Sequence, residues 1–157
     1  MTQQKPFSSA DVKRASFALM SKELDSDLTL LAKTMEVLTY WRDAHVQPLF
    51  KAEQLLNKFV PMIDKDAFIA KRLKRVESIK KKLNFNKDRE CGPMLLTTMQ
   101  DIGGIRVVLT NHKKLYSLYK VLKNESCFKK EGNTLKINNY IDEPKKFGYR
   151  GIHLISK

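Results

Sequence analysis

The stretch Gly-Ile-Arg-Val-Val-Leu at residues 104–109 is the clearest strand signal in this sequence. Its β-branched side chains predict a strand, and Asn111 can cap a helix that runs from there to about Lys123. Beyond that helix, residues 128–137 resemble a β-hairpin and residues 149–155 resemble a final strand. The C-terminal half of the chain is therefore expected to contain a sheet.

The N-terminal half is patterned as helices. Apolar residues recur at three- and four-residue steps over residues 9–38, and Ser8 followed by Asp11 is a capping signal. We expect a second helix over residues 39–59 and a third over residues 64–83. Three helices followed by strand, helix, hairpin and strand predict an α+β domain in which helices flank a mixed β-sheet.

Composition narrows the class of protein. The 157 residues are 42% hydrophobic and 30% charged, as in folded globular domains. No apolar run approaches the ~18 residues of a membrane span, and the N-terminus does not resemble a secretory signal. Cys91 and Cys127 lack the spacing of a zinc site and fit a reducing compartment. We therefore expect a cytoplasmic protein without a membrane partner.

Positive charge is both high and uneven. The formal net charge of +13 favours polyanionic partners such as nucleotides or RNA. Residues 65–89 contain ten basic and three acidic side chains. A solvated helix face would produce the same grouping, so the charge alone does not identify a site.

The first of three informative segments lies in the third expected helix. Lys74, Ser78 and Lys82 are four residues apart, so on a helix they would form one column of donors about 12 Å long. That length matches a triphosphate, whose oxygens bind ammonium and hydroxyl groups well. Arg72 falls in the apolar sector of the same helix. Its guanidinium therefore needs an anion or an aromatic plane, or else it extends past its neighbours to solvent.

The second segment covers residues 100–106. It places Asp101 at the mouth of the expected strand, with two glycines that allow close backbone approach and Arg106 just inside. A carboxylate at a strand end, with phosphate nearby, is a natural Mg²⁺ ligand.

The third segment covers residues 140–153. Alternation along a strand would put Tyr149 and His153 on one face, about 13 Å apart. The tyrosine offers a stacking surface, and Gly151 between them leaves room for a ligand.

Together, in this order, the three segments resemble the synthetase domain of RelA/SpoT-type alarmone synthetases, over about residues 71–155. The family pattern R-x-K-x-x-x-S-I-x-x-K is met at Arg72, Lys74, Ser78, Ile79 and Lys82. The pattern D-I-x-G-x-R is met at Asp101, Ile102, Gly104 and Arg106. The pattern Y-I-x-x-P-K-x-x-G-Y-x-x-x-H is met at Tyr140, Ile141, Pro144, Lys145, Gly148, Tyr149 and His153.

The resemblance implies a pyrophosphokinase of the stringent response. It would transfer the β,γ-pyrophosphate of ATP to the 3′-hydroxyl of GDP or GTP and so make guanosine tetra- or pentaphosphate, (p)ppGpp. Two arginines would enclose the adenine, and a lysine–serine–lysine set would hold the phosphates. The implied ATP-binding residues are Arg72, Lys74, Ser78, Lys82 and Arg106. The implied catalytic and Mg²⁺-binding residue is Asp101, and the implied acceptor-binding residues are Lys145, Tyr149 and His153.

The chain departs from the family pattern at the acceptor side. The family usually has Asp before Tyr140 and often has Asn before Gly148. Here these positions hold Asn139 and Phe147.

The family also places a glutamate on a strand beyond the histidine-bearing one, where it completes the Mg²⁺ site and helps to activate the attacking hydroxyl. The sequence ends at Lys157, and its late glutamates, Glu125, Glu131 and Glu143, do not occupy that place. We therefore expect a fragment, with a helical segment at residues 1–62 and a synthetase core at residues 63–157. This chain by itself is expected to bind ATP weakly and to transfer pyrophosphate negligibly.

Two alternatives stay open. A toxic small alarmone synthetase would use the same residues to pyrophosphorylate the 3′ end of tRNA, and the net charge with Arg42 and His45 would suit RNA contacts. In place of contacting RNA, His45 could pack in the core beside Trp41, which is one helical turn away. A non-catalytic module that binds nucleotide or RNA is the second alternative. A homo-oligomer and an antitoxin partner are both compatible with the resemblance.

Overall fold

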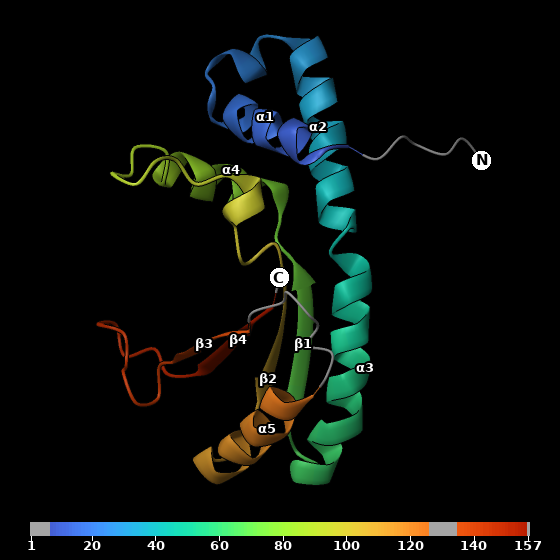
Figure 1. Ribbon diagram of the computed structural model, residues 1–157, viewed down its shortest axis with the longest axis vertical. Coiled ribbons are helices and arrows are strands. Elements are labelled where there is room, and N and C mark those ends of the chain that lie inside the picture. Colours follow the sequence, from blue (N-terminus) through green and yellow to red (C-terminus); the bar gives the residue numbers. More distant parts are fainter. Residues whose placement is uncertain (1–6, 126–134, 157) are drawn as a thin grey trace, which may run out of the picture. The chain divides into compact units, whose positions relative to one another are not determined.

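Helices dominate the first half of the chain in the computed structural model, which describes residues 7–125 and 135–156 (Figure 1). The first, α1, covers Ser9–Met20 and begins with the predicted capping box. The Ser8 hydroxyl accepts a hydrogen bond from the Asp11 N–H at 3.2 Å, and the Asp11 carboxylate accepts one from the Ser8 N–H at 2.8 Å. Hydrogen bonds from Ser8 lower the pKa of Asp11 to about 2. The bond from the Ser8 hydroxyl has the largest effect, and the bond from the Ser8 N–H comes next.

The continuous helix expected over residues 9–38 is wrong, because two residues interrupt it. Ser21 is extended and ends α1, and a short 3-10 turn, η1, follows at Glu23–Asp25. Asp27 then caps a new helix, α2, at Leu28–Asp43, by accepting a hydrogen bond from its first turn at 2.9 Å. A periodicity count cannot separate two helices whose apolar faces point to the same core.

The second expected helix is displaced along the chain. Its counterpart, α3, covers Val46–Ile63, so the helix boundary lies near residue 45 and not near residue 39. Pro61, expected to end this helix, lies inside its last turn.

The third helix, expected over residues 64–83, is wrong in its first half. Strand β1 covers Phe68–Leu73, and only the second half is helical, as α4 at Val76–Phe85. β1 pairs with strand β2, Gly103–Val108, in a two-stranded sheet. Backbone pairing with a segment about 35 residues further on outweighs the local helical pattern, because intrinsic propensities are small compared with tertiary interactions.

The elements predicted after β2 are largely confirmed. Asn111 caps α5, His112–Asn124, and accepts a hydrogen bond from its first turn at 3.0 Å. Strand β3, Lys136–Asn139, pairs antiparallel with β4, Ile152–Ile155. The remainder of the expected hairpin at residues 128–137 lies outside the described residues. The α+β class is confirmed, and the described strands form two separate pairs, β1–β2 and β3–β4.

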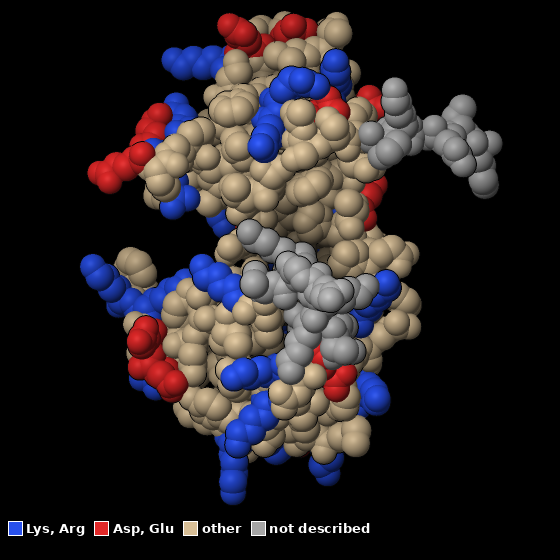
Figure 2. Space-filling model, in the orientation of Figure 1, with Lys and Arg blue, Asp and Glu red and all other residues tan. Residues whose placement is uncertain are grey.

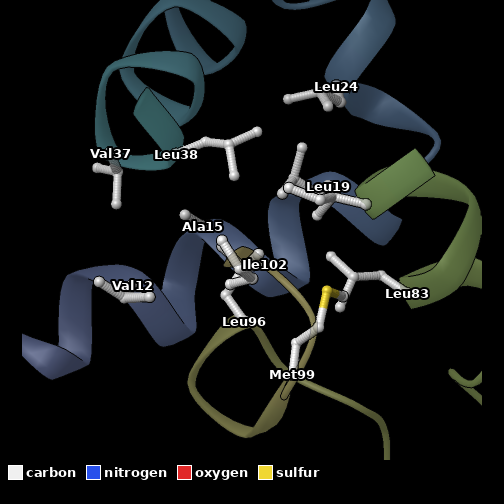
Figure 3. Close-up of a cluster of buried hydrophobic side chains, with 11 residues drawn as sticks. Val12, Ala15, Leu19, Leu24, Val37, Leu38, Leu83, Leu96, Met99 and Ile102 are labelled. Atoms are coloured by element: carbon white, nitrogen blue, oxygen red, sulfur yellow. The ribbon is translucent and has the colours of Figure 1, made fainter. Parts of the chain in front are cut away.

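Two compact units make up the chain. The first contains residues 1–53 and 70–106, and the second contains residues 54–69 and 107–157. In the first unit α1 packs on α2, α4 and the short turn η2, Leu96–Thr98. Figure 3 shows their buried apolar side chains, and the cluster consists of Val12, Ala15, Leu19, Leu24, Val37, Leu38, Ile79, Leu83, Leu96, Met99 and Ile102.

Trp41 and His45 pack at the end of α2. Trp41 contacts the core of the first unit. The Nδ1 atom of His45 lies 2.7 Å from the Trp41 carbonyl oxygen, and the two rings meet edge to face with centroids 5.4 Å apart. Both residues thus have the packing role expected from the sequence.

A buried carboxylate organises the second unit. Asp64, just after α3, accepts hydrogen bonds from Lys114 Nζ and from the Thr110 N–H, both at 2.8 Å. These hydrogen bonds hold the pKa of Asp64 well below its ordinary value, and the bond from Lys114 has the largest effect. The salt bridge and the hydrogen bond tie the start of α5 to the end of α3 within this unit.

The surface carries more basic than acidic side chains. On the face drawn in Figure 2, Lys and Arg protrude at many points and Asp and Glu at fewer. Cys91 is exposed, and Cys127 lies outside the described residues. Among residues 7–125 and 135–156, no helix has the length and apolarity needed to cross a membrane.

Candidate nucleotide-binding site

Two lysines converge on Asp101 in the first unit. Lys82 Nζ donates to Asp101 Oδ1 at 2.7 Å, and Lys74 Nζ donates to Asp101 Oδ2 at 3.1 Å. Asp101 precedes β2, Lys74 follows β1, and Lys82 lies in the last turn of α4. Three elements that are separate in sequence therefore bring the three charges together.

The cluster is net positive, because two ammonium groups surround one carboxylate. The Lys74 side chain is only 14% exposed, so water screens its charge less than that of a surface lysine. Burial raises the pKa of Asp101, but hydrogen bonds from the two lysines lower it by more, and the bond from Lys82 has the larger effect. The pKa of Asp101 is therefore below its ordinary value. At neutral pH Asp101 is ionised and engaged with both lysines.

The expected column of donors along one helix is wrong in its geometry. Lys74 precedes α4, whose N-cap is Arg75, so it does not share a helix with Ser78 and Lys82. Ser78 is exposed in the first turn of α4. The two lysines still meet, because the chain passes from β1 into α4 beside Asp101.

Arg42 of α2 fixes the segment that carries Lys74. Its Nε donates to the Lys74 carbonyl oxygen at 3.2 Å, and the Lys74 N–H donates to the Ile102 carbonyl oxygen at 2.7 Å. Both backbone polar groups of Lys74 are thus engaged. The sequence did not indicate this positioning role, because Arg42 lies far from the motif and a guanidinium that binds a carbonyl leaves no local pattern.

One face of the β1–β2 pair lies against α3. A Cβ atom placed on Gly103 of β2 would lie 2.9 Å from Leu49 Cδ1 of α3. On β1, Lys71 forms an ion pair with Glu53 of α3. Because side chains alternate along a strand, the residues next to Gly103 and Lys71 face the other way.

Alternation assigns Arg72 and Arg106 to that other face. Both are exposed, and β1 and β2 are hydrogen-bonded neighbours. The expectation that Arg72 sits in an apolar helical sector is wrong, because the residue is on a strand. From the alternation of side chains we expect the two arginines to lie on the same face of one small sheet.

A largely apolar groove borders this sheet in the first unit. Its volume is about 420 Å³, and its walls suit a ring system better than a phosphate. The sequence did not reveal it. The groove lies between the start of α3 and β1 and is lined by Val46, Gln47, Leu49, Phe50, Lys71, Arg72 and Leu73.

The second unit contains a cluster of three aromatic rings and a lysine. Tyr149 Oη and His153 Nε2 are 2.9 Å apart. The ring centroids of Tyr140 and His153 are 5.1 Å apart and meet edge to face. Lys145 Nζ lies 4.4 Å from the Tyr140 ring centroid and 5.7 Å from that of Tyr149. The three acceptor-side residues expected from the sequence are therefore together.

Their geometry differs from the expectation. The strand predicted over residues 149–155 begins only at Ile152, so Tyr149 lies before it. Gly148, with φ of +75°, closes a turn that brings Tyr149 back toward the strand. The strand spacing behind the expected separation of about 13 Å does not apply to Tyr149, which lies before β4, and its side chain is hydrogen-bonded to that of His153.

Residues 71–157 match the family model described as a region found in RelA / SpoT proteins. The chain belongs to the RelA/SpoT family. The matched region covers more than half of the chain and runs from within β1 to its end. The curated proteins that were compared give no significant match. As a RelA/SpoT protein, the chain is a member of a nucleotide pyrophosphokinase-like family.

Every site residue expected from the sequence lies inside this RelA/SpoT region. The structure groups the lysine pair with Asp101 and groups the three acceptor-side residues in the second unit. Alternation puts the two arginines on one face of the sheet, and Ser78 is exposed at the start of α4. The residues in question are Arg72, Lys74, Ser78, Lys82, Asp101, Arg106, Lys145, Tyr149 and His153.

Asp101 is the residue of the RelA/SpoT region that could hold Mg²⁺ in the first unit. In the part of the chain that the structure describes, no group of three or more His, Cys, Asp or Glu side chains could hold a metal ion. Mg²⁺ is commonly bound by one or two carboxylates, with phosphate oxygens and water as its other ligands. The Asp101 carboxylate beside two lysines that could bind phosphate fits that donor set.

Proposed function

We propose that this RelA/SpoT protein transfers the β,γ-pyrophosphate of ATP to the 3′-hydroxyl of GDP or GTP. The observation that carries the proposal is the convergence of Lys74 and Lys82 on Asp101. Two ammonium groups on one carboxylate leave an unneutralised positive charge, and a polyphosphate supplies the missing negative charge.

The start of α4 strengthens the case for phosphate binding. In the described structure Arg75, the N-cap residue, makes no capping hydrogen bond through its side chain. The N–H groups of the first turn, together with the Ser78 hydroxyl, are therefore available to phosphate oxygens, which a helix N-terminus favours. Lys74 immediately precedes this turn, so the same phosphates could use both.

Arg72 and Arg106 suit the adenine. Planar guanidinium groups stack on aromatic rings, and we expect these two, both exposed, on one face of the β1–β2 pair. Binding by stacking needs no hydrogen bond to the base, so it would orient ATP while the lysines hold its phosphates.

The aromatic cluster of the second unit suits the acceptor base. Tyr149 offers a π-surface, and Lys145 and His153 lie beside it. By the same proposal, Asp101 would bind Mg²⁺ together with the phosphates, and the ion would neutralise charge on the transferred group. The contribution of the chain is then mainly positioning and charge neutralisation.

A transfer assay tests the proposal. The chain is incubated for hours with Mg²⁺, γ-labelled ATP and, separately, GDP, GTP or tRNA, and the products are separated by chromatography. Because the described residues bring one carboxylate to the site, transfer should be about 10²–10⁴-fold slower than with a second carboxylate acting as general base. In keeping with the negligible transfer expected from the sequence, we expect only a trace of labelled guanosine 3′-pyrophosphate after hours. Saturable ATP binding without transfer to any acceptor would contradict the enzyme and favour a nucleotide-binding module.

A second candidate acceptor is the 3′ end of an RNA such as tRNA. The observation in its favour is the segment before β4, where Phe147 is 99% exposed. Lys146 and Arg150, on either side of Phe147 in the sequence, are also exposed. Basic side chains interleaved with an exposed ring are typical of single-stranded nucleic acid binding. Labelling of tRNA in preference to GDP and GTP in the same assay would favour this acceptor.

A further inference from the structure

The side chain of Tyr149 lies next to Gly151, where any other residue would carry a Cβ atom. A Cβ atom placed on Gly151 would be 3.2 Å from Tyr149 Oη, 3.5 Å from Cζ and 3.6 Å from Cε1. The first of these distances is shorter than an ordinary carbon–oxygen contact. The phenol ring therefore rests across the backbone of Gly151, in space that any other residue would partly fill.

The position of the ring has a second determinant. Tyr149 Oη is hydrogen-bonded to His153 Nε2 at 2.9 Å, and the two rings meet edge to face with centroids 5.6 Å apart. Tyr140 contacts both rings edge to face. The hydroxyl of Tyr149 is thus held at one end by His153, and the Gly151 backbone lies beneath it.

Gly151 is also held in place by the backbone. Its carbonyl oxygen accepts a hydrogen bond from the Tyr140 N–H at 2.8 Å. Gly151 directly precedes β4, which is paired with β3. Because this bond holds the backbone, we expect a side chain added at Gly151 to displace the tyrosine ring by a few tenths of an ångström.

We propose that Gly151 is a positioning residue for the acceptor base, because it lets Tyr149 lie across the start of β4 and hydrogen-bond His153. This inference rests on the proposed function, in which Tyr149 stacks on that base. The hydrogen bond fixes the plane of the ring before the base arrives, so less side-chain freedom is lost on binding.

The test is a double-mutant cycle of Gly151→Ala and Tyr149→Phe in the full chain. In the Tyr149→Phe background the 3.2 Å contact no longer exists, and the closest remaining contact, 3.5 Å to Cζ, is ordinary. The ring-nitrogen chemical shifts of His153 are measured by NMR without nucleotide. The affinities for GDP and for ATP are measured separately by calorimetry.

We expect Gly151→Ala to move the Nε2 shift of His153 and to weaken GDP binding roughly five-fold, the loss typical of one partly exposed hydrogen bond. The affinity for ATP should not change. Tyr149→Phe should weaken GDP binding by a similar factor, and Gly151→Ala should then add nothing. An unchanged His153 shift, or an effect of Gly151→Ala that persists in the Tyr149→Phe background, would overturn the positioning role.

The two proposals fail in different ways. If Gly151→Ala moves the His153 shift but the unmutated chain binds no GDP or GTP, the acceptor assignment of the proposed function is wrong, and the positioning role falls with it. If GDP binds and the variant leaves both the shift and the affinity unchanged, the proposed function survives and the role of Gly151 is wrong.

Discussion

In the proposed ATP site, the Asp101 carboxylate would compete with phosphate for Lys74 and Lys82. Its hydrogen bonds to Lys82 and Lys74 have to be exchanged when a polyphosphate binds. Mg²⁺ would be the natural partner for the released carboxylate. Binding of phosphate and binding of metal at this site should therefore be coupled. Without metal, Asp101 should lower the affinity of the site for phosphate.

The substitution Asp101→Asn tests this coupling. Without Mg²⁺, in the presence of a chelator, we expect the variant to bind inorganic pyrophosphate roughly three-fold more tightly than the unmutated chain, because both lysines lose a partly exposed ionic partner. With Mg²⁺ and ATP, the variant should transfer no pyrophosphate. Calorimetric titration measures the first effect, and weaker binding of metal-free pyrophosphate by the variant would contradict the competition.

At the residue level the sequence predicted that Lys74 and Lys82 lie together, but the geometry that it predicted for them is wrong. Lys74 and Lys82 were selected because helical spacing would align them, whereas they meet at Asp101 from two different elements. The resemblance to the family patterns rested on the type and order of these residues, and that part of the prediction did not depend on the helix. The hydrogen bond from Arg42 to Lys74 could not be predicted, because it joins distant segments through a backbone carbonyl.

At the scale of elements, the sequence predicted helix caps, one strand and one helix reliably. The caps at Ser8 and Asn111, strand β2 and helix α5 are all confirmed. Periodicity failed where it had to separate adjacent elements, as at β1. The strand that pairs with β1 is formed by residues 103–108, and no local pattern in β1 reveals this partner.

The buried carboxylate at the end of α3 makes stability depend on pH. The folded-state pKa of Asp64 is depressed below its ordinary value of 3.8, first by the hydrogen bond from Lys114 and then by that from Thr110. A depressed pKa stabilises the folded state fully above the unfolded-state value, and this contribution is lost as pH falls through the folded-state value. The second unit should therefore lose stability progressively below about pH 4.

The substitution Asp64→Asn should remove this dependence. We expect a lower melting temperature at pH 7, by roughly 5 °C, and a difference from the unmutated chain that shrinks as pH falls from about 4. Thermal unfolding followed by circular dichroism between pH 2.5 and pH 7 measures both effects. Asp66→Asn, a nearby exposed carboxylate, serves as the control. A constant difference across this pH range would show that Asp64 does not act through its charge.

On the scale of the whole molecule, the candidate site residues of the RelA/SpoT region belong to two different units. The lysine pair, Asp101 and both arginines belong to the unit made of residues 1–53 and 70–106. The aromatic cluster belongs to the unit made of residues 54–69 and 107–157. The net charge of +13 favours polyanions of any kind, so charge alone cannot establish a specific ATP site.

The most direct test of the ATP site is therefore one that separates specific lysines from general charge. ATP affinity is measured by calorimetry at fixed salt for the unmutated chain, Lys74→Ala, Lys82→Ala and the control Lys81→Ala, an exposed lysine adjacent to Lys82 on α4. Each charge-assisted contact is worth about 1.5–3 kcal/mol, so Lys74→Ala and Lys82→Ala should each weaken ATP binding about ten-fold or more, while Lys81→Ala should change it less than about two-fold. Equal losses in all three variants, or no loss in any of them, would contradict the account.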